Sequence, residues 1–398
     1  MNITIMQNHQ LKQAVELSDR IFLKQPEQRS MGVSFPPIFS PGISHSYGAW
    51  DDQKLVSFMG FVPYTMQIHD AKLNVYSIGS VCTDPDYRGQ RLAGSILEQC
   101  FRHAESSLAS LIFISGGRSL YTRAGSRRFG RAVRYHLLPG NAESLRSAGN
   151  PRSKIRKMQP EDLFKLHAVM EQRQARYTTT PSELDRLLGA SAYSNVIRMQ
   201  QQVLVAEDGG QLIAYAIIAV PGMELTPSRE ATLVEWGGQP AAAAHMIGEA
   251  IQSLHLPELT VPLAWQDQQL ATLLHAAGAT SETIQNDGTV YVVSGPQLLL
   301  QLASCCRNIS LKLQAIMDHT NCIWQKQPCN LMMRVCYRSC SIQSHLIVQR
   351  TTFHSTPFLC LILQVYNIFS ITSNSASDTS HEGSYECAFS LRLAILLQ

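Results

Sequence analysis

The sequence predicts a mixed α/β protein in which one order of helices and strands occurs twice, followed by a tail of different composition. Apolar residues follow helical and strand spacing in the same order over residues 1–137 and again over 153–302. Between these repeats, residues 138–152 are polar and rich in Gly, Pro, Ser and Asn, which is typical of a linker. From residue 303 to residue 398, glycine nearly disappears and cysteine accumulates.

Length and composition indicate a globular chain and exclude some partners. The chain has 398 residues, 45% of them hydrophobic, so ~150 residues per domain predicts two or three domains. A formal net charge of +3 gives no general attraction to nucleic acid, and we expect no nucleic-acid partner. The N-terminus lacks the features of a secretory signal, and no apolar run reaches the ~20 residues of a membrane span. We therefore expect a cytoplasmic protein with reduced thiols and no membrane partner.

In the first repeat, apolar spacing predicts a helix, an antiparallel set of strands, and then helix, strand and helix. A Pro/Gly-rich loop over 32–42 follows the first helix and is expected to border a pocket. The expected elements are a helix over 10–24, strands over 45–50, 55–62 and 73–82, a helix over 89–105, a strand over 108–114 and a helix over 119–125.

The second repeat follows the same plan with different residues. Its expected elements are a strand over 154–158, a helix over 160–172, a hairpin of 202–207 with 212–220, a strand over 231–236, a helix over 240–254, a strand over 259–264 and a helix over 268–277. Both repeats thus predict a mixed sheet with helices on its faces.

The segment 81–94 has the clearest chemical pattern in the chain. An apolar strand ends at Thr83, a compact turn follows, and a helix begins near Gly89. The first turn of a helix leaves N–H groups unpaired and carries partial positive charge, so it can hold a pyrophosphate with help from Arg88 and Arg91. The alternative is an ordinary helix start with two solvated arginines. Neither GxGxxG nor GxxxxGK[ST] is present in this segment.

This segment resembles the acetyl-CoA signature of the GNAT superfamily of N-acetyltransferases, Arg/Gln-x-x-Gly-x-Gly/Ala. Arg88, Arg91 and Ala93 occupy its three marked positions, with Arg91 in place of the central glycine. Residues 120–125, Leu-Tyr-Thr-Arg-Ala-Gly, are similar to the later Leu-Tyr-x-x-x-Gly segment of that superfamily. The resemblance covers the element order from about Asn2 to Arg134. It implies two tandem acyl-CoA N-acyltransferase (GNAT) folds.

The resemblance also implies direct transfer of an acetyl group from acetyl-CoA to an amine, without a covalent enzyme intermediate. Tyr121 is the expected proton donor to the departing CoA thiolate, because a phenol with an ordinary pKa of about 10 keeps its proton at neutral pH. The alternative for Tyr121 is a core tyrosine. The expected acetyl-CoA contacts are Val81, Cys82, Thr83, Arg88, Gly89, Gln90, Arg91, Leu92, Ala93 and Gly94.

The sequence does not identify a general base or a nucleophile. Glu27, Asp51, Asp52 and Glu105 are expected to be solvated surface acids, and His45 and His103 to be surface or hydrogen-bonded histidines. Cys82 is expected to face the core.

The second repeat is expected to be structural and not to bind CoA. At the position of the signature it has Val234-Glu235-Trp236-Gly237-Gly238-Gln239-Pro240, without arginine. Glu235 is expected at the surface, with a place in the cleft between the halves as the alternative. An active and a degenerate copy followed by a tail resemble bacterial proteins of the enhanced intracellular survival (Eis) type, whose terminal carboxylate takes part in catalysis. We do not assign that role to Gln398.

The tail over 303–398 has three interpretations. It is a third domain, a metal module, or sequence translated out of the native frame. It has eight of the ten cysteines but only one glycine, Gly383, which favours the third interpretation. Spacings among Cys322, Cys329, Cys336 and Cys340 do not match zinc knuckles, and we expect no metal.

The sequence suggests two candidate functions. The first is an N-acetyltransferase acting on a small-molecule or peptide amine, with an apolar or mixed acceptor pocket because the loop 31–46 lacks acids. The alternative is a non-catalytic CoA-binding or interaction protein with a decayed site. The sequence does not decide between a monomer and a homo-oligomer.

Overall fold

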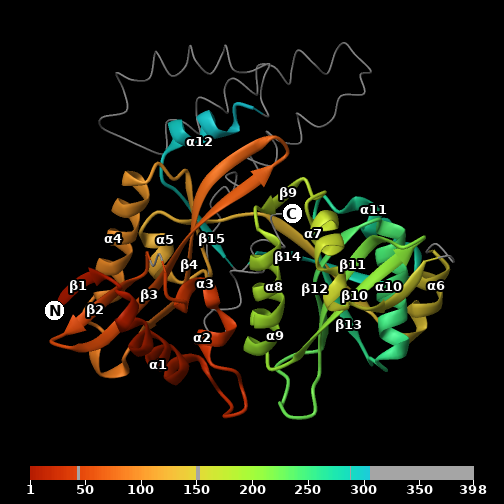
Figure 1. Cartoon of the computed structure of the whole chain (residues 1–398), viewed down its shortest axis with the longest axis horizontal. Helices are drawn as coiled ribbons and strands as arrows, with labels where there is room; N and C mark the ends of the chain where they lie inside the picture. Colours follow the sequence, from red (N-terminus) through yellow and green to blue (C-terminus); the bar gives the residue numbers. More distant parts are fainter. Residues whose placement is uncertain (43–44, 149–152, 287, 305–398) are drawn as a thin grey trace.

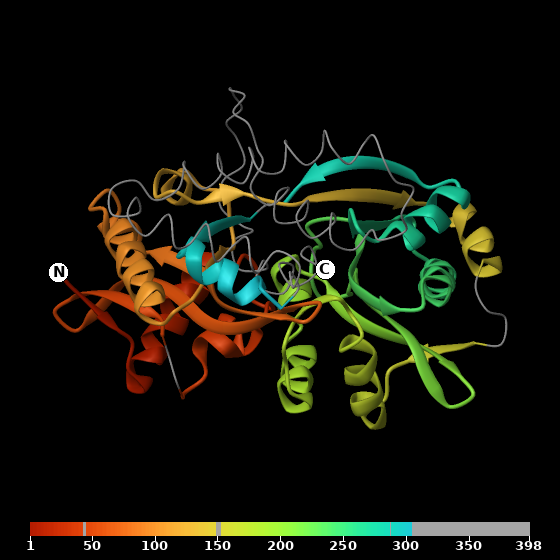
Figure 2. The same ribbon diagram turned by 90° about the horizontal axis from the view of Figure 1, so that it is seen from above.

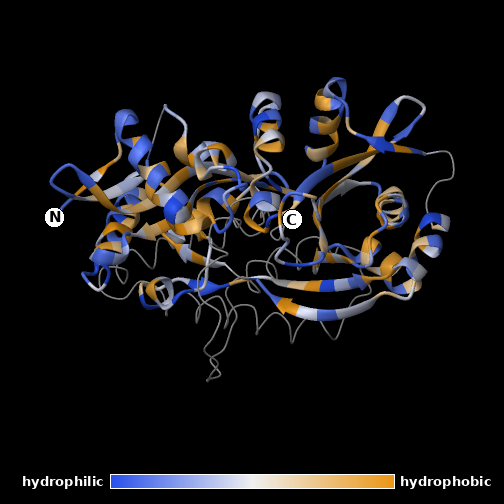
Figure 3. Ribbon diagram, turned by 90° about the horizontal axis from the view of Figure 1, so that it is seen from below, coloured by the Kyte–Doolittle hydropathy of each residue, from blue (hydrophilic) through white to orange (hydrophobic). Residues whose placement is uncertain are grey.

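The computed structural model describes residues 1–42, 45–148, 153–286 and 288–304, which form two halves, each containing one mixed β-sheet covered by helices (Figure 1). The mixed α/β class expected from the sequence is thereby confirmed. In Figure 3 the helices alternate between apolar and polar colours, as amphipathic helices packed on a sheet should.

The strands of the first sheet are β1 (Asn2–Ile5), β2 (Tyr47–Asp51), β3 (Lys54–Ile68), β4 (Ala71–Thr83), β5 (Leu111–Ile114), β6 (Arg127–Arg128), β9 (Ala175–Tyr177) and β15 (Thr289–Val292). Their order is β1-β2-β3-β4-β5-β15-β6, and β9 pairs with β3 outside this row. β4 and β5 are parallel, whereas β2, β3 and β4 form the antiparallel set expected from the sequence.

Helices cover both faces of the first sheet. They are α1 (Leu11–Phe22), α2 (Met31–Ser34), α3 (Pro36–Phe39), α4 (Leu92–Ser106) and α5 (Ser119–Arg123). Apolar residues of α1, α2 and α3 pack with Phe58 and Cys82 on one face, and those of α4 and α5 pack with Ile78 on the other. The expected loop over 32–42 thus contains two one-turn helices, the first capped by Ser30 and the second begun by Pro36.

The strands of the second sheet are β7 (Arg131–Leu137), β8 (Lys154–Lys157), β10 (Gln200–Asp208), β11 (Gln211–Val220), β12 (Ala231–Gly238), β13 (Leu259–Ala264) and β14 (Thr280–Gln285). Their order is β14-β7-β13-β12-β11-β10-β8. The helices after the first half are α6 (Ala142–Ser147), α7 (Leu163–Met170), α8 (Pro181–Ala190), α9 (Ala192–Val196), α10 (Pro240–Ser253), α11 (Gln268–Ala276) and α12 (Gly295–Leu302). α6, α10 and α11 cover one face of this sheet, and α7, α8 and α9 the other.

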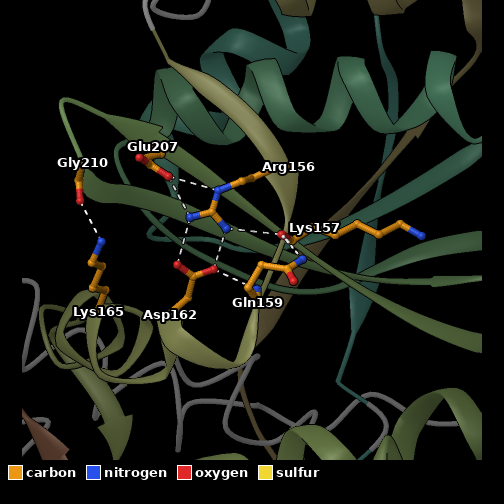
Figure 4. A network of polar contacts seen from close by, with 7 residues as sticks. All are labelled: Arg156, Lys157, Gln159, Asp162, Lys165, Glu207 and Gly210. Carbon is orange, nitrogen blue, oxygen red and sulfur yellow. Dashed lines mark hydrogen bonds and ion pairs between the residues drawn. The ribbon is translucent and has the colours of Figure 1, made fainter.

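Arg156 of the edge strand β8 connects this strand to β10 and to the turn before α7 (Figure 4). Its guanidinium donates to both carboxylate oxygens of Asp162, at 2.5 and 2.9 Å, and to Glu207 of β10 at 2.7 and 3.0 Å. The hydrogen bonds from Arg156 lower the pKa of Asp162, although burial acts in the opposite direction. The network therefore fixes β8 against the short turn that leads into α7.

The two halves exchange strands. β7 leaves the first half and pairs with β13 and β14 in the second sheet, while β15 returns from the second half and pairs with β5 and β6 in the first. β6 and β7 are consecutive in the chain, as are β14 and β15. β6 pairs antiparallel with β15 in the first sheet, and β7 pairs antiparallel with β14 in the second. The long pair of β7 and β14 is visible in Figure 2. The exchange connects both sheets through hydrogen bonds of the backbone.

The structure differs from the expected organisation in two places. The expected linker 138–152 contains α6, whose Ala142 and Leu145 are fully buried in the core under α10. The expected first domain, 1–137, ends in β7, which belongs to the second sheet. Apolar periodicity predicted the strand over 259–264 but not its non-local partner, because register across sheets leaves no local pattern.

Apart from residues 303 and 304, the tail lies outside the described residues, as do its cysteines, Gly383 and Gln398. No helix in the described ranges is long and apolar enough to cross a bilayer.

Candidate functional site

The candidate site begins at an irregularity in β4. Phe58 pairs with Cys82 but Gly60 pairs with Gly79, so β4 holds one residue more than the facing part of β3. Ser80, in this interval, adopts a left-handed backbone with φ of 50°. Such a bulge bends a strand and redirects its side chains.

β4 and β5 separate at this bulge. Their parallel pairing ends where Ile78 lies opposite Ile114. The backbone N–H and the hydroxyl of Ser115 both donate to the carbonyl of Ile78, each at 3.0 Å, and close the last pairing. β4 continues to Thr83, so this edge of its final residues has no β5 partner.

Val81, Cys82 and Thr83 occupy the strand end after the bulge. Cys82 is buried, 4% exposed, with its sulfur 3.7 Å from the Ser18 hydroxyl, as expected for a core thiol. Val81 packs against the core on the α4 face of the sheet. The hydroxyl of Thr83 lies 2.8 Å from that of Ser57. The three residues therefore alternate between the two faces of the sheet.

Asp84 anchors the turn that follows. Its carboxylate lies 2.9 Å from Arg20 and 3.2 Å from Lys54, and it accepts the N–H of Asp86 at 3.2 Å. Burial alone would raise the pKa of Asp84, but these donors lower it below its ordinary value. Asp84 thus fixes the start of the short 3₁₀ turn Pro85–Tyr87, a role that the sequence did not indicate.

Arg91 caps the N-terminus of α4 in the left-handed conformation, with φ of 61° and ψ of 15°. Glycine adopts this conformation at low cost, which gives a physical reason for the glycine at this place in the signature. Gly89, two residues earlier, has φ of 80°. Arg88, Gly89, Gln90 and Arg91 are exposed, whereas Leu92 is buried and Ala93 and Gly94 are half-buried. The free N–H groups of the first helical turn therefore lie beside two exposed arginines.

Tyr121 lies in α5 and is fully buried. Its ring belongs to the core formed with Leu92 and Ile78, under α4. A Cβ placed on Gly94 would lie 3.8 Å from Leu120, so α5 lies beside the first turn of α4. The structure therefore brings the two predicted motifs together.

The other polar residues considered in the sequence have ordinary surroundings. Glu27, Asp51, Asp52 and Glu105 are exposed, as expected. His45 lies 3.0 Å from the Tyr76 hydroxyl, and His103 lies 3.0 Å from that of Tyr47. Burial lowers the pKa of both histidines, and the charge of His45 adds to the effect on His103. Both are hydrogen-bonded histidines in an aromatic cluster with Tyr76 and Phe61.

A cavity of about 100 Å³ lies between the two halves. Its lining includes Pro37 and Ile38 of α3, Tyr64 of β3, Arg176 and Tyr177 of β9, and Glu235 of β12. Residues of the loop 32–42 thus border a pocket, as the sequence predicted. The Cδ1 methyl group of Ile38 lies 3.5 Å from a Cβ placed on Gly79, so this wall of the cavity reaches the bulge of β4.

The charged groups of this cavity are partly neutralised. Glu171 accepts two hydrogen bonds from Arg176, at 3.1 and 2.9 Å, which lower the pKa of Glu171. Glu235 accepts a hydrogen bond of 2.8 Å from Tyr215. Glu235 is only 5% exposed, so the expectation of a surface position was wrong and the cleft alternative was right. β12 is a central strand with helices on both faces, which buries even a charged residue.

The second half repeats the bulge and the strand separation but not the turn. Ile217 pairs with Glu235 and Ile218 with Leu233, so Val234 is the extra residue. The parallel pairing of β12 with β13 ends where Thr232 lies opposite Thr260. Only Gln239 then separates β12 from α10, whereas residues 84–91 separate β4 from α4. The segment expected to hold pyrophosphate has no counterpart in the second half.

Comparisons with known proteins agree with this geometry. The family model described as acetyltransferase (GNAT) domain matches residues 2–130. A conserved protein of unknown function from Enterococcus faecalis, described as a probable N-acyltransferase, shares the fold with a TM-score of 0.60 and 17% identity, over 75% of this chain and 74% of that chain. Eis1 from Mycobacterium abscessus has a TM-score of 0.55 and 12% identity, over 76% of each chain. A GCN5-related N-acetyltransferase from Anabaena variabilis has a TM-score of 0.57 and 12% identity, over 75% and 74%. No curated protein matches the chain.

The bulged β4, its separation from β5 and the turn into α4 therefore define an acyltransferase domain of the GNAT class. The N-terminal half of the chain thus contains a GNAT acetyltransferase domain, and the fold of the chain is shared with Eis1. Within the described residues, no group of three or more His, Cys, Asp or Glu side chains could hold a metal ion.

Proposed function

We propose that the protein transfers the acetyl group of acetyl-CoA to an amine acceptor, at the end of β4 in the N-terminal half. The observation that supports this most strongly is the open edge of β4, followed directly by a turn with two exposed arginines at the N-terminus of α4. Acetyl-CoA needs both features, because the strand edge can pair with its pantetheine and thioester end and the helix start can bind its pyrophosphate.

The residues of the segment have separate roles in holding acetyl-CoA. The N–H groups from Gly89 to Gly94, including those of Gln90, Leu92 and Ala93, bind the pyrophosphate together with Arg88 and Arg91. The backbone of Val81, Cys82 and Thr83 along the open edge of β4 pairs with the amides of pantetheine and orients the acetyl carbonyl. The small Ala93 and Gly94 let the phosphates approach the helix closely.

In the reaction, the neutral amine nitrogen attacks the thioester carbonyl carbon, and a new C–N bond forms while the C–S bond breaks. The sulfur leaves with the bonding electron pair and takes a proton from Tyr121, giving free CoA thiol. The nitrogen loses one proton to solvent, and the Tyr121 phenolate takes one proton from solvent, which restores the phenol. The products are an N-acetylated amine and CoA, and no covalent enzyme intermediate forms.

The acceptor enters through the cavity between the halves. Ile38 connects this cavity to the bulge of β4, where the acetyl carbonyl would lie. Apolar side chains from α3 and α8, together with the paired Arg176 and Glu171, favour an amine with an apolar portion over a polycation.

The test is acetyl transfer to a panel of amines, followed as CoA thiol release and as acetylated product by mass spectrometry. Arg88→Ala and Arg91→Ala should each weaken CoA binding about tenfold, as expected for losing a charge-assisted hydrogen bond. Binding of a pantetheine fragment without pyrophosphate should not change. Equal losses for both ligands would contradict the phosphate role.

Tyr121→Phe tests the proton donor separately. The variant should bind CoA normally but turn over more slowly at neutral pH, with kcat reduced more than KM is changed. Full turnover by Tyr121→Phe would show that another group supplies the proton.

A further inference from the structure

A second cavity, of about 300 Å³, lies in the second half where β12 and β13 separate. Its walls include Trp236 and Gly238 at the end of β12, Gln266 and Asp267 after β13, Arg173 before β9, and His69 at the turn between β3 and β4. Its volume is at the lower end of the range for small-molecule sites.

This cavity occupies the position that corresponds to the proposed acetyl-CoA site of the first half. In both halves a bulge follows directly after the last parallel pair, Ile78 with Ile114 and Thr232 with Thr260. The second half lacks the turn for pyrophosphate, and α10 begins with Pro240, which has no N–H to offer an anion. A ligand here must therefore be small and bound by side chains.

The cavity contains one cationic and one acidic side chain. The guanidinium carbon of Arg173 lies 5.5 Å from the centre of the Trp236 ring. Its Nη1 atom is buried and has no hydrogen-bond partner among the described residues. Oδ2 of Asp267 accepts the indole N–H of Trp236 at 3.3 Å. Burial raises the pKa of Asp267, while the charge of Arg173 and hydrogen bonds from Trp236 and the backbone of Ala264 act in the opposite direction. A buried donor without an acceptor costs free energy that a ligand oxygen would recover.

We propose that this cavity binds a free α-amino acid, with its carboxylate on Arg173 and its ammonium group on Asp267. The two side chains have the charges that complement such a zwitterion, and both line the same cavity. The site is independent of acetyl-CoA, and its occupancy does not require the acyl-transfer reaction.

The experiment measures binding of the free proteinogenic α-amino acids to the full chain without CoA, by saturation-transfer NMR and titration calorimetry. At least one should bind with one-to-one stoichiometry. Its N-acetyl derivative lacks the ammonium group and its amide lacks the carboxylate, so each should bind about tenfold more weakly. Because these ligands are compared on the unchanged protein, the result does not depend on how a variant folds.

Two variants and matched controls locate the site. Arg173→Gln and Asp267→Asn should each weaken binding about tenfold, whereas Arg186→Gln and Asp185→Asn on the exposed face of α8 should not. Arg88→Ala should leave amino-acid binding intact while weakening CoA, which separates this site from the proposed function. The proposal is overturned if no amino acid binds at millimolar concentration, if both derivatives bind as well as the parent, or if folded Arg173→Gln binds normally.

Discussion

Asn195 of α9 and Arg29, in the segment between α1 and α2, exchange two hydrogen bonds across the halves. The side-chain oxygen of Asn195 accepts the backbone N–H of Arg29 at 2.9 Å, and its amide nitrogen donates to the carbonyl of Arg29 at 2.8 Å. The same amide also donates to the hydroxyl of Ser34 at 2.9 Å. One side chain of the second half thus holds the segment that contains α2 and α3, which form a wall of the cavity between the halves.

Asn195→Ala should therefore destabilise the protein and loosen that wall. Asn195 is 4% exposed, and losing three hydrogen bonds at a buried position should cost about 3 kcal/mol of unfolding free energy. Urea denaturation measures the loss, and the KM for the acceptor should rise more than the KM for acetyl-CoA. The exposed Asn74→Ala is the control. A loss no larger than that of the control would show that Asn195 does not hold the segment.

Gly60 and Gly79, paired across β3 and β4, should respond differently to alanine. A Cβ on Gly60 would lie 2.7 Å from the carbonyl of Gly79 and 2.8 Å from Ile38, whereas one on Gly79 would make ordinary contacts of 3.5 Å. Gly60→Ala should lower the unfolding free energy by about 2 kcal/mol through strain at the bulge. Gly79→Ala should fold normally but lose activity, because its methyl group lies between Ile38 and Ser115 at the proposed acyl position. Equal stability of both variants would contradict the contacts at the bulge.

Arg91→Gly and Arg91→Ala separate charge from backbone conformation. Both remove the guanidinium, but only glycine adopts φ near 61° without strain. If the charge matters, both variants should weaken CoA binding about tenfold relative to the parent. If the backbone alone matters, Arg91→Ala should keep the parent affinity, because alanine and arginine pay the same cost at this φ, and only Arg91→Gly should change it. Calorimetric titration with CoA distinguishes these results, and we expect the first.

The paired histidines predict how stability changes with pH. Burial lowers the pKa of His45 and His103 in the folded protein, so the unfolded chain binds protons first as the pH falls. The unfolding free energy should therefore decrease as the pH falls below the ordinary histidine pKa of about 6.5, and stop decreasing below the folded-state values. His103→Phe should flatten this slope, while exposed His9→Gln should not. The same slope in His103→Phe and in the parent would contradict the prediction.

Much of the fold was predictable because its signals are local. The helix at 11–22, the hairpin of β10 with β11 and the turn after Thr83 follow from apolar spacing and turn residues. The strand exchange was not predictable, because β7 and β15 find partners more than a hundred residues away. The same limit applies to Asn195, whose contacts with Arg29 depend on how the halves meet.

The candidate site was predictable only where its sequence signal is local. Residues 81–94 form one continuous segment, so their motif was visible in the sequence. Glu235 was expected at the surface, although its position within the apolar run 231–236 was a signal of burial. Arg20 and Lys54, which form ion pairs with Asp84, come from other elements, so no local sequence pattern indicated these contacts.

Transfer of a labelled acetyl group tests the central claim most directly. The protein is incubated with acetyl-CoA labelled in the acetyl group and with amines of graded apolar character, and the label is followed by mass spectrometry. We predict that the label appears on the amine nitrogen in an amount equal to the CoA thiol released, and that Arg88→Ala with Arg91→Ala suppresses both. Tight CoA binding with no labelled amide for any amine would contradict the claim and leave a CoA-binding protein without transferase activity.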